Sequence, residues 1–160
     1  MKIVIAAIGR LKDGPERLLA ARYAERAAKT GRAMALGPLD IRELPESRAA
    51  RPADRKREEG AALASLIAPG NPVIVLDETG KSLPSADFAA RLGRWRDDGA
   101  ACVHFLIGGA DGLDPALVKR ADLVLSFGSQ TWPHQIVRVL LAEQIYRAAT
   151  ILSGHPYHRE

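Results

Sequence analysis

The chain has 160 residues, which is the size of one ordinary domain and is long enough to bury a core without disulfides or a structural metal ion. Its hydrophobic fraction of 47% and charged fraction of 26% are typical of globular proteins and argue against a disordered or fibrous chain. The net charge of +4 is a mild excess of base, which suits a polyanionic partner but does not require one. We therefore expect a single globular domain over residues 1–160.

The sequence shows no evident targeting segment and no membrane span. The apolar run from Met1 to Ile8 is too short for the core of a secretory signal with its flanks. No stretch approaches the roughly 20 apolar residues that cross a bilayer. We therefore expect a cytoplasmic protein that does not contact a membrane.

Short apolar segments alternate with helical patterns along the chain. The expected elements are, in order, a strand at 2–8, a helix at 15–30, a strand at 39–44, a helix from about 52 to 68, a strand at 73–76, a helix at 84–95, a strand at 103–107, a short helix at 115–120, a strand at 123–125 and a helix at 135–152. The strand at 73–76 is continuously apolar, as in strands buried on both faces. Without hairpin turn signals, this alternation predicts an α/β domain with a mainly parallel sheet and helices on both faces.

The last expected helix, 135–152, is apolar on most of its circumference. The main interruptions are Arg138, Glu143 and Arg147. So broad an apolar surface needs cover on more than one side, which in a small domain predicts a subunit interface.

Two residues with reactive side chains are expected to be structural. Cys102 is the one cysteine, so an intramolecular disulfide is excluded, and its apolar neighbours predict a packed thiol. His104 flanks the apolar strand at 103–107 and is expected to pack there.

Three loops that follow predicted strands are the candidate binding site. In open parallel sheets, ligands bind beyond the carboxyl ends of the strands. These loops are 76–81, 108–112 and 126–134. Gly108 and Gly109 allow the backbone to approach a ligand closely, and such loops would form a cleft suited to a neutral heterocycle such as adenine. The alternative for each loop alone is an ordinary tight turn. The loops lack both G-x-G-x-x-G and G-x-x-x-x-G-K-[ST], which disfavours dinucleotide and phosphate-loop nucleotide binding.

Basic residues gather between positions 42 and 57, and they are Arg42, Arg48, Arg51, Arg55, Lys56 and Arg57. This stretch is a candidate contact surface for RNA, and the alternative is a solvated helix face. The C-terminal residues 153–160 are dense in functional groups and are expected to dock against protein or ligand. A metal site built on His155, His158 and Glu160 is not favoured, because no helix aligns them and the chain lacks a second ligand cluster. We predict no metal.

Three segments of the C-terminal half carry a resemblance to a known family. They are LIGGADGL at 106–113, TWPH at 131–134 leading into RVLLAEQIYRA at 138–148, and HPYH at 155–158. In this order and spacing the chain resembles the ribosomal RNA large subunit methyltransferase H family over its whole length. The resemblance implies the SPOUT fold, an α/β domain with a deep C-terminal trefoil knot. It also implies a homodimer that transfers a methyl group from S-adenosylmethionine to N3 of a pseudouridine in 23S rRNA, on the assembled ribosome.

The resemblance also implies roles for single residues. The implied cofactor contacts are Leu76, Gly108, Gly109, Phe127, Gly128, Ser129, Gln130, Thr131 and Trp132. The loop departs from the commoner Ser-x-x-Thr-Leu-Pro-His wording of the family, so contacts from its backbone are expected more than contacts from particular side chains. The tail residues Tyr157, His158 and Arg159 are implied to reach the cofactor pocket of the partner subunit.

Methyl transfer to N3 requires loss of the N3 proton, which a base near neutral pKa or a cation beside the ring would assist. His134 or His158 could act as the base, and Arg147 or Arg159 as the cation. Arg147 also follows Glu143 by one helical turn, where a salt bridge is the plain alternative. Three other functions stay open: a SPOUT methyltransferase acting on transfer RNA or another ribosomal site, an RNA-binding module without catalysis, and a nucleotide-binding protein without methyl transfer.

Overall fold

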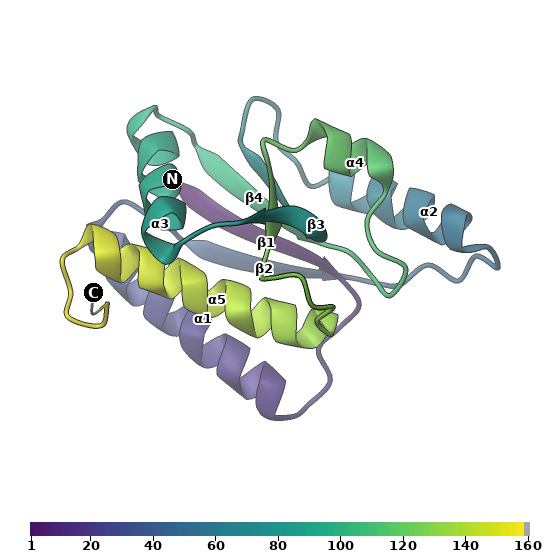
Figure 1. The fold of residues 1–160 in the computed structure, drawn as a ribbon, viewed down its shortest axis with the longest axis horizontal. Helices are drawn as coiled ribbons and strands as arrows, with labels where there is room; N and C mark the ends of the chain where they lie inside the picture. Colours follow the sequence, from purple (N-terminus) through teal and green to yellow (C-terminus); the bar gives the residue numbers. More distant parts are fainter. Residues whose placement is uncertain (159–160) are drawn as a thin grey trace.

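Strands and helices alternate along residues 1–158, the part of the chain that the computed structural model describes (Figure 1). The elements are β1 (Lys2–Ile8), α1 (Pro15–Ala33), β2 (Leu39–Leu44), α2 (Pro52–Ala64), β3 (Val73–Ser82), α3 (Ser85–Asp97), β4 (Cys102–Ile107), α4 (Pro115–Arg120), β5 (Leu123–Ser126) and α5 (His134–Leu152). Prolines begin α1, α2 and α4, where the missing N–H costs little because amides of the first turn have no helical partner. The predicted alternation is confirmed.

The strands form one parallel sheet in the order β2-β1-β4-β3-β5. β4 lies at the centre, and all of its residues are buried. Because parallel strands end at the same edge of a sheet, the loops after β3, β4 and β5 lie next to one another. The sheet therefore brings together the three segments predicted to bind a ligand. The strand order is consistent with the trefoil knot of the SPOUT fold.

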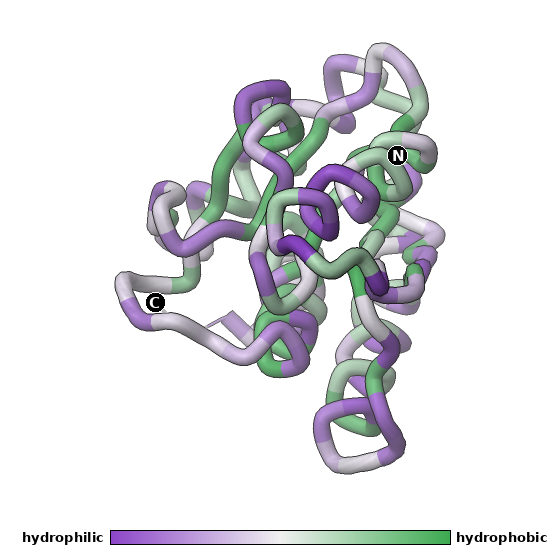
Figure 2. Tube along the Cα trace, turned by 90° about the vertical axis from the view of Figure 1, so that its right-hand side faces the viewer, coloured by the Kyte–Doolittle hydropathy of each residue, from purple (hydrophilic) through white to green (hydrophobic). Residues whose placement is uncertain are grey.

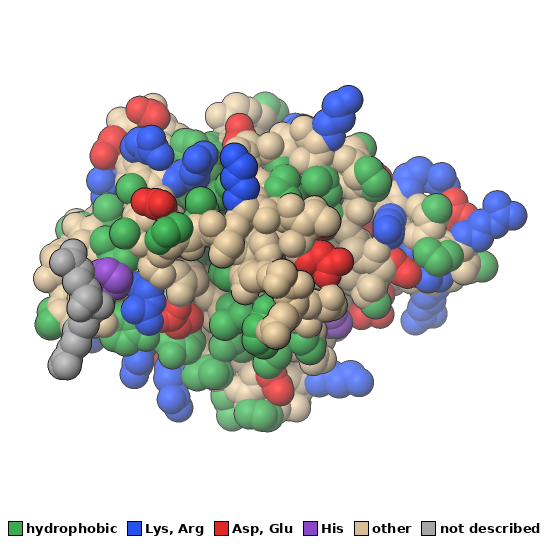
Figure 3. Space-filling model, viewed as in Figure 1, with side chains coloured by type: hydrophobic (Ala, Val, Ile, Leu, Met, Phe, Trp, Pro, Cys, Tyr) green, Lys and Arg blue, Asp and Glu red, His purple; other side chains and the backbone are tan. Residues whose placement is uncertain are grey.

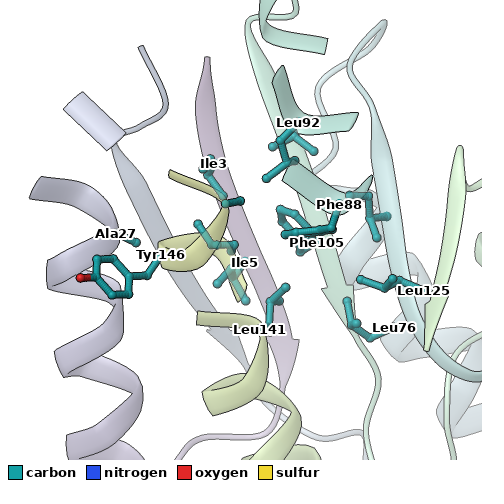
Figure 4. Packing of buried hydrophobic residues seen from close by; sticks show 14 of the residues in the cluster. Ile3, Ile5, Ala27, Leu76, Phe88, Leu92, Phe105, Leu125, Leu141 and Tyr146 are labelled. Carbon is teal, nitrogen blue, oxygen red and sulfur yellow. The ribbon is translucent and has the colours of Figure 1, made fainter. Parts of the chain in front are cut away.

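Helices cover both faces of the sheet, as predicted. On one face, α1, α3 and α5 pack on side chains such as Ile5, Phe105 and Leu125 (Figure 4). On the other face, α2 and α4 pack on Ile8 and Val75. Figure 2 shows green hydrophobic segments inside the molecule and purple hydrophilic segments mostly on its outer turns. Each fully buried large apolar side chain contributes roughly 1.5–3 kcal/mol to folding, so these two clusters hold the layers together.

The third strand is longer than its apolar run predicts. The sequence predicts a loop at 76–81, whereas β3 continues to Ser82. The pairing with β5 breaks after Leu76 and resumes at Lys81, and both residues lie opposite Leu125. Glycine is required at position 80 for β3 to pair with β5 again, because a Cβ there would lie 2.7 Å from the carbonyl carbon of Val124. The polar residues 77–79 therefore form an irregularity within a strand.

The long apolar helix α5 is covered largely by its own chain. It lies against α1 and α3 over the sheet, and none of its residues is exposed. Leu141, Ile145 and Ala148 belong to the same buried cluster as the strands. The apolar circumference of α5 therefore finds most of its cover within one subunit, and the predicted subunit interface stays a prediction.

Cys102 and His104 both lie in the buried strand β4, as expected. Cys102 is a free, buried thiol whose pKa is raised by burial. His104 is 2% exposed, its Nε2 lies 3.4 Å from the amide nitrogen of Ala68, and burial lowers its pKa. Burial thus favours the neutral form of each side chain. Within residues 1–158, no helix is long and apolar enough to cross a membrane.

Candidate active site

A cavity of about 680 Å³ lies where the carboxyl ends of β3, β4 and β5 meet. All three predicted loops contribute to its wall, through residues 76–79, 107–113, 125–128 and 130–134, joined by Lys56 and Val137. The volume is within the usual range of small-molecule sites. Of the expected cofactor contacts, the cavity includes every one except Ser129, which is exposed beside it.

The glycine loop after β4 folds tightly and still forms part of the cavity wall. Gly109 and Gly112 form a bridge in which the Gly112 amide donates to the Gly109 carbonyl at 3.0 Å. Gly112 has φ +87°, a conformation that favours glycine. A Cβ on Gly108 would lie 2.8 Å from the carbonyl carbon of Gly112. The loop is therefore both a tight turn and a main-chain wall of the cavity.

The loop after β5 is fixed by polar contacts. Ser126 donates its hydroxyl to the Gly128 carbonyl at 2.7 Å, and Gly128 has φ +122°. The Thr131 hydroxyl donates to the Glu78 carboxylate at 2.8 Å, which joins this loop to the irregular part of β3. Trp132 is 41% exposed although it belongs to the cavity wall, so its indole is available to a ligand or substrate.

A salt bridge from α2 anchors the glycine loop, and no pattern in the sequence predicts it. Arg55 donates from Nε and Nη2 to the two carboxylate oxygens of Asp111, at 2.6 and 3.1 Å. Its Nη1 also donates to the carbonyls of Ala49 and Ala50, at 3.0 Å each. The hydrogen bond from Arg55 lowers the pKa of Asp111, so this carboxylate is ionised at neutral pH. Arg55 and Asp111 lie 56 positions apart, and no local pattern connects them.

Two buried charges support the same edge of the sheet. Glu59 on α2 is 6% exposed, and one of its carboxylate oxygens accepts from the Ser47 amide at 2.9 Å. Arg138 on α5 is 3% exposed and donates to the carbonyls of Ile8 and Gly9 and to Glu43, at 2.6, 2.8 and 2.8 Å. Arg138 therefore provides hydrogen-bond donors to the backbone carbonyls at the carboxyl end of β1. The signal in the sequence was an arginine within an otherwise apolar helix face.

The expected catalytic residues fall into two separate groups. His134 lies in the cavity wall at the start of α5. Arg147 lies thirteen positions further along the same helix, which corresponds to roughly 20 Å. The wall of the cavity includes no residue from 138–158. One subunit therefore does not bring His134 together with Arg147 or with the tail.

The tail folds back onto its own α5 (Figure 1). Tyr157 donates to Glu143 at 3.2 Å, and its ring centroid lies 4.6 Å from that of Tyr146. Arg147 binds Glu143 at 2.6 Å, so the salt bridge named as the alternative to a catalytic role is present, and its guanidinium stacks 4.9 Å from the Tyr157 ring. Burial, followed by the hydrogen-bonding contact with the Tyr23 hydroxyl and the negative charge of Glu143, raises the pKa of Tyr157 to about 12. The phenol is therefore protonated at neutral pH.

The remaining tail residues contribute less to this cluster. His158 is half-buried, and its Nδ1 has no hydrogen-bond partner among residues 1–158. Arg159, expected to act beside it, lies outside the described residues. In that same described part of the chain, no group of three histidine, cysteine or acidic side chains could hold a metal ion.

Comparisons with known proteins give a consistent result. A family model described as "Predicted SPOUT methyltransferase" matches residues 1–158. A Ribosomal RNA large subunit methyltransferase H from Bradyrhizobium sp. strain BTAi1 is 61% identical, with 99% of each chain covered. A protein of the same name from Rhodopseudomonas palustris strain BisB5 is 59% identical, again over 99% of each chain. A probable methyltransferase from Bordetella pertussis Tohama I has a similar fold, with a TM-score of 0.51 at 16% identity, covering 92% of this chain and 96% of that one.

Proposed function

Because the chain belongs to the SPOUT methyltransferase family, we propose that it transfers a methyl group from S-adenosylmethionine to N3 of a pseudouridine in 23S rRNA. The observation that carries this proposal is the end-to-end similarity to proteins named Ribosomal RNA large subunit methyltransferase H. The cavity at the ends of β3, β4 and β5 supports it, because a small-molecule methyl donor needs such a site.

The wall of the cavity fits the chemistry of S-adenosylmethionine. Leu76, Ile107 and Leu125 offer apolar surface for the adenine ring. The carboxylates of Asp77 and Glu78 can accept hydrogen bonds from ribose hydroxyls or the ammonium group. We propose that the cofactor contacts come from Leu76, Gly108, Gly109 and the loop Phe127–Trp132, with Ser129 contributing through its backbone. No metal is part of this proposal.

The remaining task of the protein is to align the RNA base and to remove its N3 proton. When bound, S-adenosylmethionine supplies an electrophilic methyl group, so alignment is the larger part of catalysis. His134 lies in the cavity wall and can accept the N3 proton through its imidazole. His158 is the alternative base. A guanidinium from Arg147 or Arg159 beside the pseudouridine ring would stabilise the negative charge that loss of the N3 proton leaves on it.

We propose that the active site is completed by a second copy of the chain. In one subunit, the tail is roughly 20 Å along α5 from the cavity, and Tyr157 and Arg147 are held against Glu143. A homodimer in which the tail of one subunit reaches the cavity of the other would bring His134 of one subunit close to Arg147 and the tail of the other. We also propose that the protein acts in the cytoplasm, because its proposed substrate is ribosomal RNA.

A methylation assay tests the proposal. Radiolabelled S-adenosylmethionine is incubated with the protein and with ribosomes from a bacterium that lacks this modification, and the RNA is then digested to nucleosides. We expect label in N3-methylpseudouridine. Label on transfer RNA, with none on ribosomes, would refute the substrate but preserve the reaction. Failure to bind S-adenosylmethionine in calorimetry would refute the function and favour an RNA-binding module without catalysis.

A further inference from the structure

Positive charge gathers beside the cavity, over the segment 48–57, which is called the basic segment below. Figure 3 shows Lys and Arg side chains at the right-hand end of the molecule, where α2 begins in Figure 1. The segment holds one acid, Asp54, against five bases: Arg48, Arg51, Arg55, Lys56 and Arg57. This ratio of basic to acidic residues is far higher than that of the whole chain, which has 23 Lys and Arg against 19 Asp and Glu.

Ion pairing divides these bases into two classes. Arg55 binds Asp111, and Arg57 binds Asp54 at 2.7 Å. By contrast, Arg48, Arg51 and Lys56 form no salt bridge within residues 1–158. Arg48 and Arg51 are also exposed. The uncompensated charge of the basic segment therefore resides on these three side chains.

The basic segment is held in place beside the cavity. Arg55 donates hydrogen bonds to the carbonyls of Ala49 and Ala50 in this segment and to the carboxylate of Asp111 in the glycine loop. Glu59 accepts from the Ser47 amide just before the segment. Such anchoring fixes the backbone that carries Arg48 and Arg51, which distinguishes this surface from a freely solvated helix face.

The same surface continues into the cavity. Lys56 belongs to the cavity wall, and it also borders a second hollow of about 520 Å³ formed with Pro52, Arg57 and Pro115. Trp132, 41% exposed in the cavity wall, offers an aromatic face. Proteins that recognise unstacked RNA bases combine such a stacking face with cations that contact the backbone phosphates.

We propose that Arg48, Arg51 and Lys56 form the phosphate-binding surface that guides RNA to the cavity, with Trp132 beside the entering base. This inference rests on the proposed function, because the cavity must hold the methyl donor. Arg55 serves a different purpose: it positions the basic segment against the glycine loop and does not contact RNA. Arginine suits this phosphate contact because its planar fork donates two parallel hydrogen bonds.

The test is a pair of charge-matched variants. R48Q/R51Q removes two cations from the basic segment. R94Q/R120Q removes two from the opposite edge of the sheet, because α3 and α4 end there just before β4 and β5 begin. Arg94 and Arg120 are likewise exposed and form no salt bridge among the described residues. Methyl transfer to ribosomes is measured for both variants between 50 and 200 mM salt, and affinity for S-adenosylmethionine is measured by calorimetry.

We expect R48Q/R51Q to raise the KM for ribosomes about tenfold. Affinity falls as salt rises, and each lost phosphate contact makes the plot of log affinity against log salt less steep by about 0.7–0.9, so the slope should become less negative by about 1.4–1.8. Affinity for S-adenosylmethionine should stay within about twofold, which also shows that the variant is folded. R94Q/R120Q should leave the KM and the slope unchanged.

The outcomes separate this inference from the proposed function. Normal methylation by the wild-type protein, with R48Q/R51Q retaining its KM and salt slope, would overturn the phosphate-binding surface and leave the function standing. An equal rise in KM for both variants would also overturn it, because the effect would then be one of total charge. Absence of any label on ribosomes with the wild-type protein would overturn the proposed function, and this surface with it.

Discussion

The glycine loop after β4 gives the sharpest structural prediction, through Gly108→Ala. A Cβ at this position would lie 2.8 Å from the carbonyl carbon of Gly112, 2.9 Å from its oxygen and 3.0 Å from the amide nitrogen of Leu113. All three are backbone atoms, so no side chain can rotate away, and the loop must move by several tenths of an ångström. Overpacking of this kind typically costs about 1–3 kcal/mol. For a domain of this size, the melting temperature should fall by roughly 2–10 °C.

The functional effect should exceed the effect on stability. Movement of the loop displaces the wall formed by Gly108 and Gly109, so we expect affinity for S-adenosylmethionine to fall at least tenfold in calorimetry. Gly14→Ala is the matched control, because a Cβ there would meet only the flexible Glu16 carboxylate, at 3.3 Å. If Gly108→Ala bound the cofactor as tightly as Gly14→Ala did, the assignment of this loop to the cofactor site would be refuted.

Three further predictions follow from buried or paired charges. Arg55→Gln should raise the KM for S-adenosylmethionine with little change in kcat, because it breaks the salt bridge that holds Asp111 and the glycine loop. Arg55→Lys keeps the positive charge and should raise the KM less. Steady-state kinetics of both variants test this prediction. Arg138→Met should cost roughly 3 kcal/mol in urea unfolding, because it removes the ion pair of Glu43 and the side-chain donor to two buried carbonyls. A loss below about 1 kcal/mol would contradict this role of Arg138. Burial lowers the pKa of His104, so the unfolded chain takes up this proton first; stability should fall as the pH drops through about 6.5, and His104→Gln should flatten that part of the profile in urea unfolding measured between pH 5 and 8.

Much of the fold followed from local patterns in the sequence. The alternating apolar and helical segments predicted the strands and helices, because each buried strand here is short and strongly apolar. The continuation of β3 to Ser82 was not predicted, because residues 77–82 lack large apolar side chains and only Lys81 and Ser82 among them pair with β5, after an irregularity. Strand order was not predictable from patterns either, since it depends on pairing between distant segments such as Ile5 with Phe105.

The site was predictable to the extent that it follows strand ends. The three loops were found because ligands of parallel sheets bind beyond the carboxyl ends of the strands, and the resemblance supplied their expected cofactor roles. The contact of Arg55 with Asp111 was missed because it joins distant segments. The distance between His134 and Arg147 could have been estimated from the length of α5 alone. That distance would already have indicated that the two residues cannot act together within one subunit.

The proposed activity can be tested in cells by nucleoside mass spectrometry of 23S rRNA from a bacterium whose own methyltransferase of this type has been deleted. We expect expression of this chain to restore N3-methylpseudouridine in that RNA. We expect the Gly108→Ala variant, expressed at the same level, to restore much less. Unmodified pseudouridine in cells that contain the folded wild-type protein would contradict the proposed methylation of 23S rRNA.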